Sequence, residues 1–420
     1  MTTDHCTVLI IGGGPAGLAA ALELKRLGID DICIVEREAE IGGVPRFCHH
    51  TGFGLRDLRR VRSGPAYARD YQSRIASAKV KVETATTVTG WAGQRQVCVT
   101  SPRGIHTIAA QAILLATGCR ERPAAARLVP GNRPAGVFTT GSLQRFVYGM
   151  EGQIGRRAVV VGAELVSLSA VLTLQHAHIP VAGLVTEHPA HQIYAPFTPA
   201  LWYATQWLGC PLAAERQVSR IMGHKRVEAV ELTHVQTGQV ETVPCDTVVF
   251  TGKWIAEHEL ARLGNVPLDR ATSGPQVDTA LRTGIPGIFA AGNLLRGAET
   301  ADYAALEGRH AAHSMATFLA KGDWSQTNIP ICVESPIAWV SPNQVSDAQT
   351  QPPHGVFRFQ VQQVCERAQV CIYQGARLLH RQMFAHLMPN CPYGLRSQWL
   401  PSVDRQGEPL TMKLVATTAG

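Results

Sequence analysis

The sequence contains no Cys-x-x-Cys pair, although it has 11 cysteines. Zinc ribbons, thioredoxin-like redox motifs and the local cysteine ladder of an iron–sulfur cluster all depend on close cysteine pairs, so we expect no metal site. An odd number of cysteines, several of them in apolar strand-like runs, fits buried free thiols better than a disulfide framework. We therefore expect a reducing environment and a cytoplasmic protein.

Lysine is scarce, since only seven of the 39 basic residues are lysine. One short basic cluster, Arg56, Arg59, Arg60 and Arg62, stands out on what we interpret as a helix. No stacking aromatics are interleaved with it, so we expect no nucleic acid partner; the alternatives are a solvated face, a bound phosphate or an acidic partner protein. No apolar run approaches the roughly 18 residues that cross a bilayer, so we predict no transmembrane segment. We expect the first strand to begin near Thr7, which is too early for a cleavable leader.

Length and composition predict a multidomain globular protein. The chain has 420 residues, of which 45% are hydrophobic and 17% charged. A chain this apolar can form a large core, and its length suggests two to three domains.

A strand–turn–helix pattern for dinucleotide binding opens the chain. The apolar run 7–11 leads into a GxGxxG turn and a helix, and a second strand over 32–35 ends in an acid. In this fingerprint the glycines provide a tight turn, close approach of a pyrophosphate and close helix packing, while the acid accepts a hydrogen bond from a ribose. The predicted contacts of this half of the site are Gly12, Gly14, Pro15, Ala16, Gly17, Glu36, Arg37 and Gly43.

A second set of cofactor residues lies far downstream. A strand over 287–291 runs into Gly292 and Asn293, and a helix is expected to open at Thr300 and Ala301 and continue to about Phe318. A helix N-terminus beside a flavin ring would stabilise negative charge on the reduced ring.

These motifs resemble the two-dinucleotide-domain flavoprotein family that includes thioredoxin reductases and NADH-dependent flavin reductases. The family's Ala-x-Gly-Asp turn reads as residues 290–293 here, with Asn293 in the place of the acid. Residues 113–118, which end in Ala116, Thr117 and Gly118, resemble the family's crossover between domains. The resemblance covers roughly residues 5–320 and implies bound FAD.

An internal repeat predicts a second Rossmann-like domain. A strand over 158–161 leads into a turn at Gly162, a helix to about His178 and a strand over 181–185. In the resembled family this domain binds NAD(P)H, but Glu164 and Ser167 replace the second and third glycines. A carboxylate where backbone should meet a pyrophosphate is unfavourable both sterically and electrostatically. We expect weak NAD(P) binding or none; the alternatives are a Glu164 that swings outward, or another nucleotide held there.

The altered second turn, with residues 116–123, resembles a subgroup of flavoprotein subunits. This subgroup includes the FAD subunits of opine oxidase, hydrogen cyanide synthase and dye-linked proline and hydroxyproline dehydrogenases; residues 42–54 resemble most the flavoproteins associated with glycerol-3-phosphate dehydrogenase. The resemblance implies a second flavoprotein subunit, of the amino-acid-oxidase type, that carries the small-molecule substrate site. It also implies that electrons pass to a quinone or dye.

Cys48, His49 and His50 lie on a loop that we expect to pass near the flavin. A histidine there could donate or accept a proton at neutral pH, and a loop anchor is the competing interpretation. Dithiol exchange needs an attacking and a resolving sulfur, so a lone Cys48 argues against disulfide reduction.

The predicted fold class is α/β, with two Rossmann-like dinucleotide-binding domains and a small β-rich C-terminal domain. We assign residues 1–122 and 255–328 to the FAD domain, 123–254 to a degenerate NAD(P)-binding-like domain and 329–420 to the β-rich domain. The favoured function is the FAD subunit of a hetero-oligomeric dehydrogenase that oxidises a small amine, an amino or opine acid, or a hydroxy compound. The alternatives are a stand-alone NAD(P)H-dependent flavin reductase and an assembly subunit whose flavin does not turn over.

Overall fold

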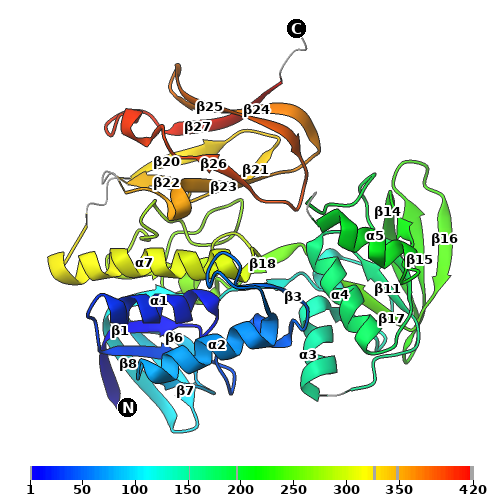
Figure 1. Ribbon diagram of the computed structural model, residues 1–420, viewed down its shortest axis with the longest axis horizontal. Helices are drawn as coiled ribbons and strands as arrows, with labels where there is room; N and C mark the ends of the chain where they lie inside the picture. Colours follow the sequence, from blue (N-terminus) through cyan, green and yellow to red (C-terminus); the bar gives the residue numbers. More distant parts are fainter. Residues whose placement is uncertain (1, 151, 195–196, 325–327, 347–349, 417–420) are drawn as a thin grey trace. The chain divides into compact units, whose positions relative to one another are not determined.

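The computed structural model describes residues 2–150, 152–194, 197–324, 328–346 and 350–416 (Figure 1). The chain divides into two compact units: residues 1–46, 51–119 and 255–420 form unit 1, and residues 47–50 and 120–254 form unit 2. The segment 329–420, which we expected to form a domain of its own, groups with unit 1 but has its own hydrophobic core. Residues 47–50, expected in the FAD domain, group with unit 2.

Unit 1 contains a seven-stranded sheet in the order β5-β2-β1-β8-β7-β6, with β19 also paired to β8. The strands β5, β2, β1, β8 and β19 run parallel, and their apolar side chains are buried as expected for a sheet covered on both faces. The bounds are β1 Thr3–Ile11, β2 Ile32–Val35, β5 Lys81–Glu83, β6 Thr87–Gly93, β7 Gln96–Ser101, β8 Gly104–Leu115 and β19 Ile288–Ala290.

The first strand starts earlier than predicted. It begins at Thr3 and not near Thr7, because residues 3–6 pair with residues 107–110 of the long strand β8. Strand pairing here extends beyond the apolar run, and the sequence pattern did not indicate that pairing.

The remaining elements of unit 1 before its C-terminal region are mostly helical or short. They are α1 Pro15–Arg26, η1 Val44–Phe47 (whose Phe47 groups with unit 2), β3 Thr51–Phe53, β4 Arg62–Ser63, α2 Gly64–Ser77, α6 Glu259–Leu263, η4 Gly292–Leu294 and α7 Ala301–Lys321. The helix predicted across Arg56 and Arg62 is wrong: residues 54–61 form turns, and Arg62 lies in β4. The buried carboxylate of Asp302 accepts backbone hydrogen bonds from Gly54, Arg56 and Asp57, which fix the turns.

Helices α1 and α7 pack against each other along the sheet (Figure 1). A glycine in the middle of α7 allows this contact: a Cβ atom on Gly308 would lie 2.0 Å from the carbonyl oxygen of Ala16. No side chain fits at that distance, so α7 requires glycine here despite its helix-weakening backbone entropy.

We expect Gly308→Ala to lower the free energy of unfolding by at least about 3 kcal/mol, because the added methyl must push α7 away from α1. Gly90→Ala is the control, since a Cβ at Gly90 meets no atom within 4 Å. Urea unfolding of both variants measures the difference. Equal stability of the two variants would show that the helices adjust without cost.

The C-terminal region of unit 1 is built from β-strands, as predicted. A five-stranded sheet has the order β22-β20-β27-β24-β25, and a three-stranded sheet has the order β21-β23-β26. Phe357 and Phe359 of β23 are fully buried in the core of this region. The bounds are β20 Asn328–Val333, β21 Ile337–Ser341, β22 Gln344–Ser346, η5 Pro353–Gly355, β23 Val356–Val361, β24 Cys365–Gln374, β25 Arg377–Leu387, β26 Tyr393–Arg396, η6 Leu400–Ser402 and β27 Leu410–Ala416.

Unit 2 repeats the Rossmann-like plan. Its parallel sheet has the order β10-β17-β11-β12-β13, and an antiparallel sheet β14-β15-β16 lies in the same unit. The bounds are η2 Ala124–Arg127, β10 Val137–Thr139, α3 Thr140–Met150, β11 Ala158–Val161, α4 Leu165–His176, β12 Val181–Val185, α5 Thr198–Gln206, β13 Leu212–Ala213, β14 Arg216–Gly223, β15 Val227–His234, β16 Val240–Pro244 and β17 Thr247–Phe250. The chain passes between the units at β9 Cys119–Glu121 and β18 Trp254–Ala256. The predicted fold class, with two Rossmann-like domains, is confirmed.

Within the described residues, no helix is both long and apolar enough to cross a membrane.

Candidate cofactor site

Two glycines of the first turn are required by the fold itself. Gly12 has a φ of +115°, and a Cβ there would lie 2.3 Å from the carbonyl oxygen of Ala116. A Cβ at Gly17 would lie 2.0 Å from the carbonyl oxygen of Gly12. Both positions therefore exclude side chains on steric grounds, whatever the turn binds.

Gly14 is different, because its Cβ position is open. No heavy atom outside its chain neighbours lies within 4 Å of that position, and its φ of −86° is ordinary for any residue. Gly14 is the N-cap of α1, and Pro15 follows in the first turn, where a missing N–H costs nothing. The open space therefore lies at a helix N-terminus, where phosphate is favoured, so these residues fit the pyrophosphate of a dinucleotide such as FAD.

The second glycine pair lies against this turn. The N–H of Gly42 donates to the carbonyl oxygen of Gly13 at 2.7 Å. Gly43 has a φ of +62°, and a Cβ there would lie 3.0 Å from the Cα of Gly14. The backbone of Gly43 therefore packs against the first turn, and its contact with the cofactor stays a prediction.

Glu36 is held ready to accept a further hydrogen bond. Its buried carboxylate accepts N–H groups from Gly13 and Glu38, each at 2.8 Å. Each carboxylate oxygen has a second lone pair, which suits a ribose hydroxyl. Arg37, by contrast, is 61% exposed and lies 4.0 Å from the carboxylate of Glu257, which is a weak ion pair.

The crossover residues 116–118 lie next to the first glycine turn and bond to the returning chain. The carbonyl of Ala116 lies against Gly12, as described, and the hydroxyl of Thr117 donates to the carbonyl of Glu257 at 2.8 Å. The N–H of Glu257 donates to the carbonyl of Gly118, whose φ is +79°. These bonds tie the outgoing crossover to the returning chain.

The downstream residues meet the first turn at the start of α1. A Cβ at Gly292 would lie 2.8 Å from the Cβ of Ala16, so the two segments touch. The side-chain oxygen of Asn293 accepts the N–H of Glu299 at 3.1 Å and shapes the loop before α7. Thr300 is the N-cap of α7, with its hydroxyl accepting the N–H of Tyr303, and Ala301 is the first helical residue. The positive end of the α7 dipole is therefore available near this turn.

Two charged residues that hold the loop at Gly292 were not predicted from the sequence. Glu307 is buried and accepts the N–H of Gly292 at 3.0 Å, and it pairs with Arg296 at 2.5 Å. Burial raises the pKa of the Glu307 carboxyl above its ordinary value of 4.5, against the opposing effect of Arg296. The available signal was a glutamate at helical spacing among the buried residues Ala304, Gly308 and Ala311.

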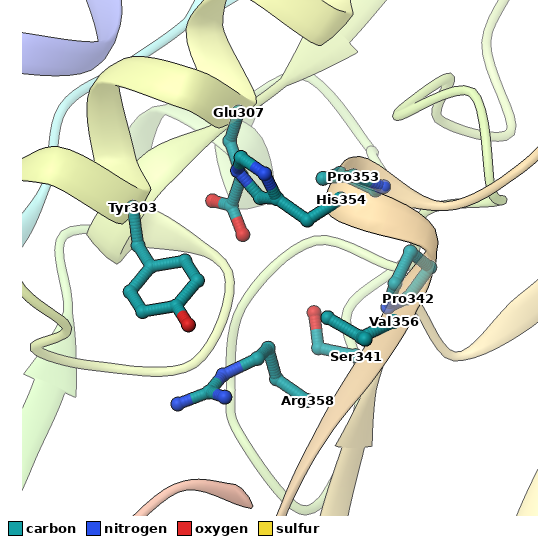
Figure 2. Close-up of a pocket in the computed structure, with 8 residues that line it drawn as sticks. All are labelled: Tyr303, Glu307, Ser341, Pro342, Pro353, His354, Val356 and Arg358. Carbon is teal, nitrogen blue, oxygen red and sulfur yellow. The ribbon is translucent and has the colours of Figure 1, made fainter. Parts of the chain in front are cut away.

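A small cavity lies beside Glu307, between α7 and the C-terminal strands. Figure 2 shows Tyr303 and Glu307 of α7 facing Ser341 and Arg358 across it. Its volume of about 10 Å³ is room for about one water molecule. The cavity is therefore too small to be the substrate site.

Two of the three candidate catalytic residues contact unit 2 helices. The buried thiol of Cys48 donates to the side-chain oxygen of Gln144 on α3 at 3.5 Å, and burial raises the pKa of Cys48 to about 12. The ring of His49 stacks on Tyr148 of α3, with ring centres 3.8 Å apart. His50 is half-buried next to them. A thiol this protonated is a poor nucleophile, so Cys48 has the geometry of an anchor, and a catalytic role for His49 or His50 stays a prediction.

The second turn has a side chain, that of Glu164, at the position that corresponds to Gly14 in the first turn. The carboxylate of Glu164 is buried and accepts the hydroxyl hydrogen of Thr251 at 2.5 Å. Cβ atoms on Gly162 and Gly252 would lie 2.7 Å and 2.5 Å from its carboxylate oxygens. The side chain of Glu164 therefore turns inward, between Gly162 and the end of β17.

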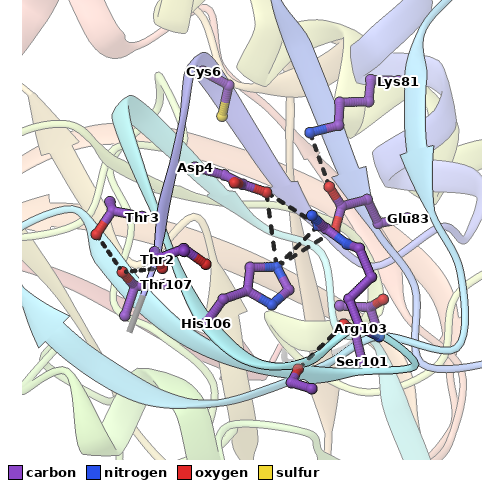
Figure 3. Close-up of polar contacts among 12 residues, drawn as sticks. Thr2, Thr3, Asp4, Cys6, Lys81, Glu83, Ser101, Arg103, His106 and Thr107 are labelled. Atoms are coloured by element: carbon purple, nitrogen blue, oxygen red, sulfur yellow. Dashed lines mark hydrogen bonds and ion pairs between the residues drawn. The ribbon is translucent and has the colours of Figure 1, made fainter.

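A cluster of metal-binding side chains in unit 1 holds an arginine. Oxygen and nitrogen atoms of Asp4, Glu83 and His106 lie close enough together to suit a metal ion. The Nη2 of Arg103 lies 3.0 Å, 2.9 Å and 3.1 Å from these three side chains (Figure 3). The guanidinium fills the place of a cation, and the cluster is a polar network that joins β1, β5 and β8.

The Arg103 cluster makes stability depend on pH. The hydrogen bond from Arg103 lowers the pKa of Asp4 below 3.8, and bonds from Lys81 and Arg103 outweigh burial to lower the pKa of Glu83 below 4.5. A carboxyl group whose pKa is lower in the folded than in the unfolded protein stabilises the fold at pH values above its unfolded-state pKa. This stabilisation is lost as the pH falls through the folded-state pKa. We expect the free energy of unfolding to fall below about pH 4.5.

The Arg103→Ala variant should lose most of this contribution, so its stability should fall less over the same acid range. Urea unfolding at a series of pH values measures both proteins. Parallel curves for the two proteins would show that Arg103 does not set the pKa values of Asp4 and Glu83.

Three comparisons with known proteins agree with this geometry. The family described as "Pyridine nucleotide-disulphide oxidoreductase" matches residues 6–308. The chain is 26% identical over 343 residues to an opine oxidase subunit of Agrobacterium tumefaciens (strain Ach5), and the match covers 74% of this chain and 65% of the relative. It is 28% identical over 266 residues to the alpha subunit of sarcosine oxidase of Rhizobium meliloti (strain 1021), covering 59% of this chain and 24% of the relative.

Among solved structures, thioredoxin reductase of Lactococcus lactis superposes with a TM-score of 0.63 at 19% identity, covering 75% of this chain and 99% of that one. This likeness shows the fold. The matches span less than two thirds of the length of the two curated relatives.

Proposed function

The chain belongs to the pyridine nucleotide-disulphide oxidoreductase family, and from this premise we propose that it is the FAD subunit of a hetero-oligomeric dehydrogenase. It is an FAD-dependent oxidoreductase, as members of its family are. The observation that supports the dehydrogenase proposal is the contrast between the glycine turns of unit 1 and unit 2. Space is open at Gly14, whereas the corresponding position of unit 2 carries Glu164, whose buried carboxylate bonds to Thr251. The enzyme then takes its electrons from a substrate other than NAD(P)H.

The residues of unit 1 would hold FAD in named roles. The α1 N-terminus and Gly14 would face the pyrophosphate, Glu36 would accept a ribose hydroxyl, and the N-terminus of α7 at Thr300 and Ala301 would favour negative charge on the ring. When bound, FAD accepts a hydride and passes electrons onward.

The substrate and partner in this proposal come from the similar proteins. We propose a small amine, an amino or opine acid, or a hydroxy compound as substrate, a quinone or dye as acceptor, and a second flavoprotein subunit of the amino-acid-oxidase type as partner. Two relatives are named as subunits of a sarcosine oxidase and an opine oxidase, which supports this choice. Cys48 has no second cysteine near it in the sequence for dithiol exchange, and burial raises the pKa of its thiol; both support the exclusion of disulfide reduction.

A second candidate function is a stand-alone NAD(P)H-dependent flavin reductase. The description of the family, which names pyridine nucleotide, favours it, but it requires Glu164 to leave its bond with Thr251.

Reconstitution with the partner subunit tests the proposed function. The chain would be expressed with and without an amino-acid-oxidase-type subunit of its own organism, and dye reduction would be followed with amines, amino acids and glycerol phosphate. We expect activity from the complex and little from either chain alone. A chain that is fully active alone would contradict the proposal that it is one subunit of a larger enzyme.

A further inference from the structure

We propose that the loop 54–62, termed here the arginine loop, is the docking surface for an acidic face of the partner subunit; this inference rests on the proposed function. The loop exposes the guanidinium groups of Arg56, Arg59 and Arg60 together with two aliphatic side chains. Leu55 is 60% exposed and Val61 is 57% exposed. Arginine beside apolar side chains is the composition of protein interfaces, which are depleted in lysine.

Two guanidinium groups of the arginine loop have no ion-pair partner among the described residues. Among the described residues, Arg59 and Arg60 have no carboxylate within ion-pair distance, and Arg56 lies over the ring of Tyr303, 4.8 Å from its centre. Only Arg62 is neutralised, by Asp70 at 3.0 Å. Guanidinium groups without partners suit paired carboxylates on another surface, which they can bind with two hydrogen bonds each.

The arginine loop is held in one conformation before any partner arrives. Asp302 accepts three of its backbone N–H groups, from Gly54, Arg56 and Asp57, at 2.9–3.0 Å. The buried side chain of Asp57 in turn accepts the hydroxyl groups of Tyr67 and Tyr71 at 2.8 Å and 2.6 Å.

Two further contacts complete this support. Arg309 of α7 pairs with Asp57 at 2.5 Å, and the carbonyl of Gly54 accepts the N–H groups of Leu58 and Arg60 within the loop. A loop fixed in this way loses little conformational entropy when it binds, which favours affinity.

These features favour a protein as the occupant over a nucleic acid or a membrane. No aromatic ring of the arginine loop is exposed for stacking on bases, since Phe53 beside it is half-buried and the Tyr303 ring is covered by Arg56. Two aliphatic side chains on a fixed turn offer much less apolar surface than an amphipathic helix inserting into lipid. The basic excess of the whole chain, 39 basic residues against 32 acidic ones, agrees with an acidic partner.

The test compares two double charge reversals in the complex with the amino-acid-oxidase-type subunit. Arg59→Glu/Arg60→Glu changes the arginine loop, and Arg262→Glu/Arg270→Glu makes the same change in net charge at exposed positions elsewhere. We expect the loop variant to raise the Kd of the complex about 30-fold at low salt and to flatten its salt dependence, while the control stays within about threefold. Flavin content of each variant, measured alone, checks that the chain is folded.

A third variant tests whether the two aliphatic side chains contribute to binding. Leu55→Ser/Val61→Ser should raise the Kd about fivefold without changing its salt dependence. If the partner subunit binds the loop variants as tightly as it binds the unchanged chain, this inference alone is overturned. If the unchanged chain forms no complex with the partner subunit, the proposed function is overturned as well. Loop-dependent binding to vesicles of anionic lipid or to single-stranded DNA would overturn the choice of a protein partner.

Discussion

The Gly14→Val variant is expected to fold normally and to lose FAD. Its φ of −86° suits valine, and the Cβ position meets no atom within 4 Å, so the fold itself has no need of glycine there. The branched side chain would stand where the pyrophosphate approaches the backbone at the α1 N-terminus. We expect FAD affinity to fall by at least about 100-fold, with an unfolding free energy within about 1 kcal/mol of the original.

Gly17→Val provides the matched comparison for this result. A Cβ at Gly17 would lie 2.0 Å from the carbonyl oxygen of Gly12, so this variant should lose stability whether or not FAD is present. Visible flavin absorbance after purification and urea unfolding of the protein without flavin measure the two effects. A yellow Gly14→Val protein with unchanged FAD affinity would show that the pyrophosphate does not approach Gly14.

Glu164→Gly is expected to let unit 2 bind NADH. The substitution removes both the bulk and the charge of a carboxylate that lies between Gly162 and Gly252. Glycine is accepted at a helix N-cap with a cost of only a few tenths of a kcal/mol, so α4 should persist. We expect the affinity for NADH to rise by about 100-fold, chiefly because removal of the side chain lets a pyrophosphate approach the backbone of the turn.

Glu164→Gln separates charge from bulk at this position. Glutamine keeps the side-chain volume and the hydrogen bond to Thr251, so we expect it to bind NADH almost as weakly as the original chain. Equilibrium dialysis or calorimetry with NADH measures all three proteins. Micromolar NADH binding by the unchanged chain would contradict the role given to Glu164.

The cofactor half of the site was largely predictable because it depends on local backbone geometry. Glycine spacing, strand ends and an acid after the second strand are properties of a short segment, and β2 and β11 lie where the sequence pattern placed them. The structure adds the distinction between the glycines: the fold excludes side chains at Gly12 and Gly17, whereas it leaves the Cβ position of Gly14 open, as the proposed pyrophosphate contact requires.

The residues that support the site from a distance could not be predicted in the same way. Asp302 and Glu307 act on loops that lie far from them in sequence, at Gly54 and Gly292, and only the packing of α7 brings them together. The same reason explains the wrong helix at Arg56: its basic pattern was interpreted locally, but long-range bonds to Asp302 set its conformation.

Anaerobic reduction of the flavin shows whether the enzyme takes its electrons from a small substrate or from NAD(P)H. The purified chain, alone and in complex with its partner subunit, would be mixed with NADH, with NADPH and with a panel of amines, amino acids and glycerol phosphate. We predict that neither pyridine nucleotide bleaches the flavin within the time of turnover, and that one of the small substrates bleaches it in the complex. Rapid bleaching of the chain alone by NADH or NADPH would contradict the account.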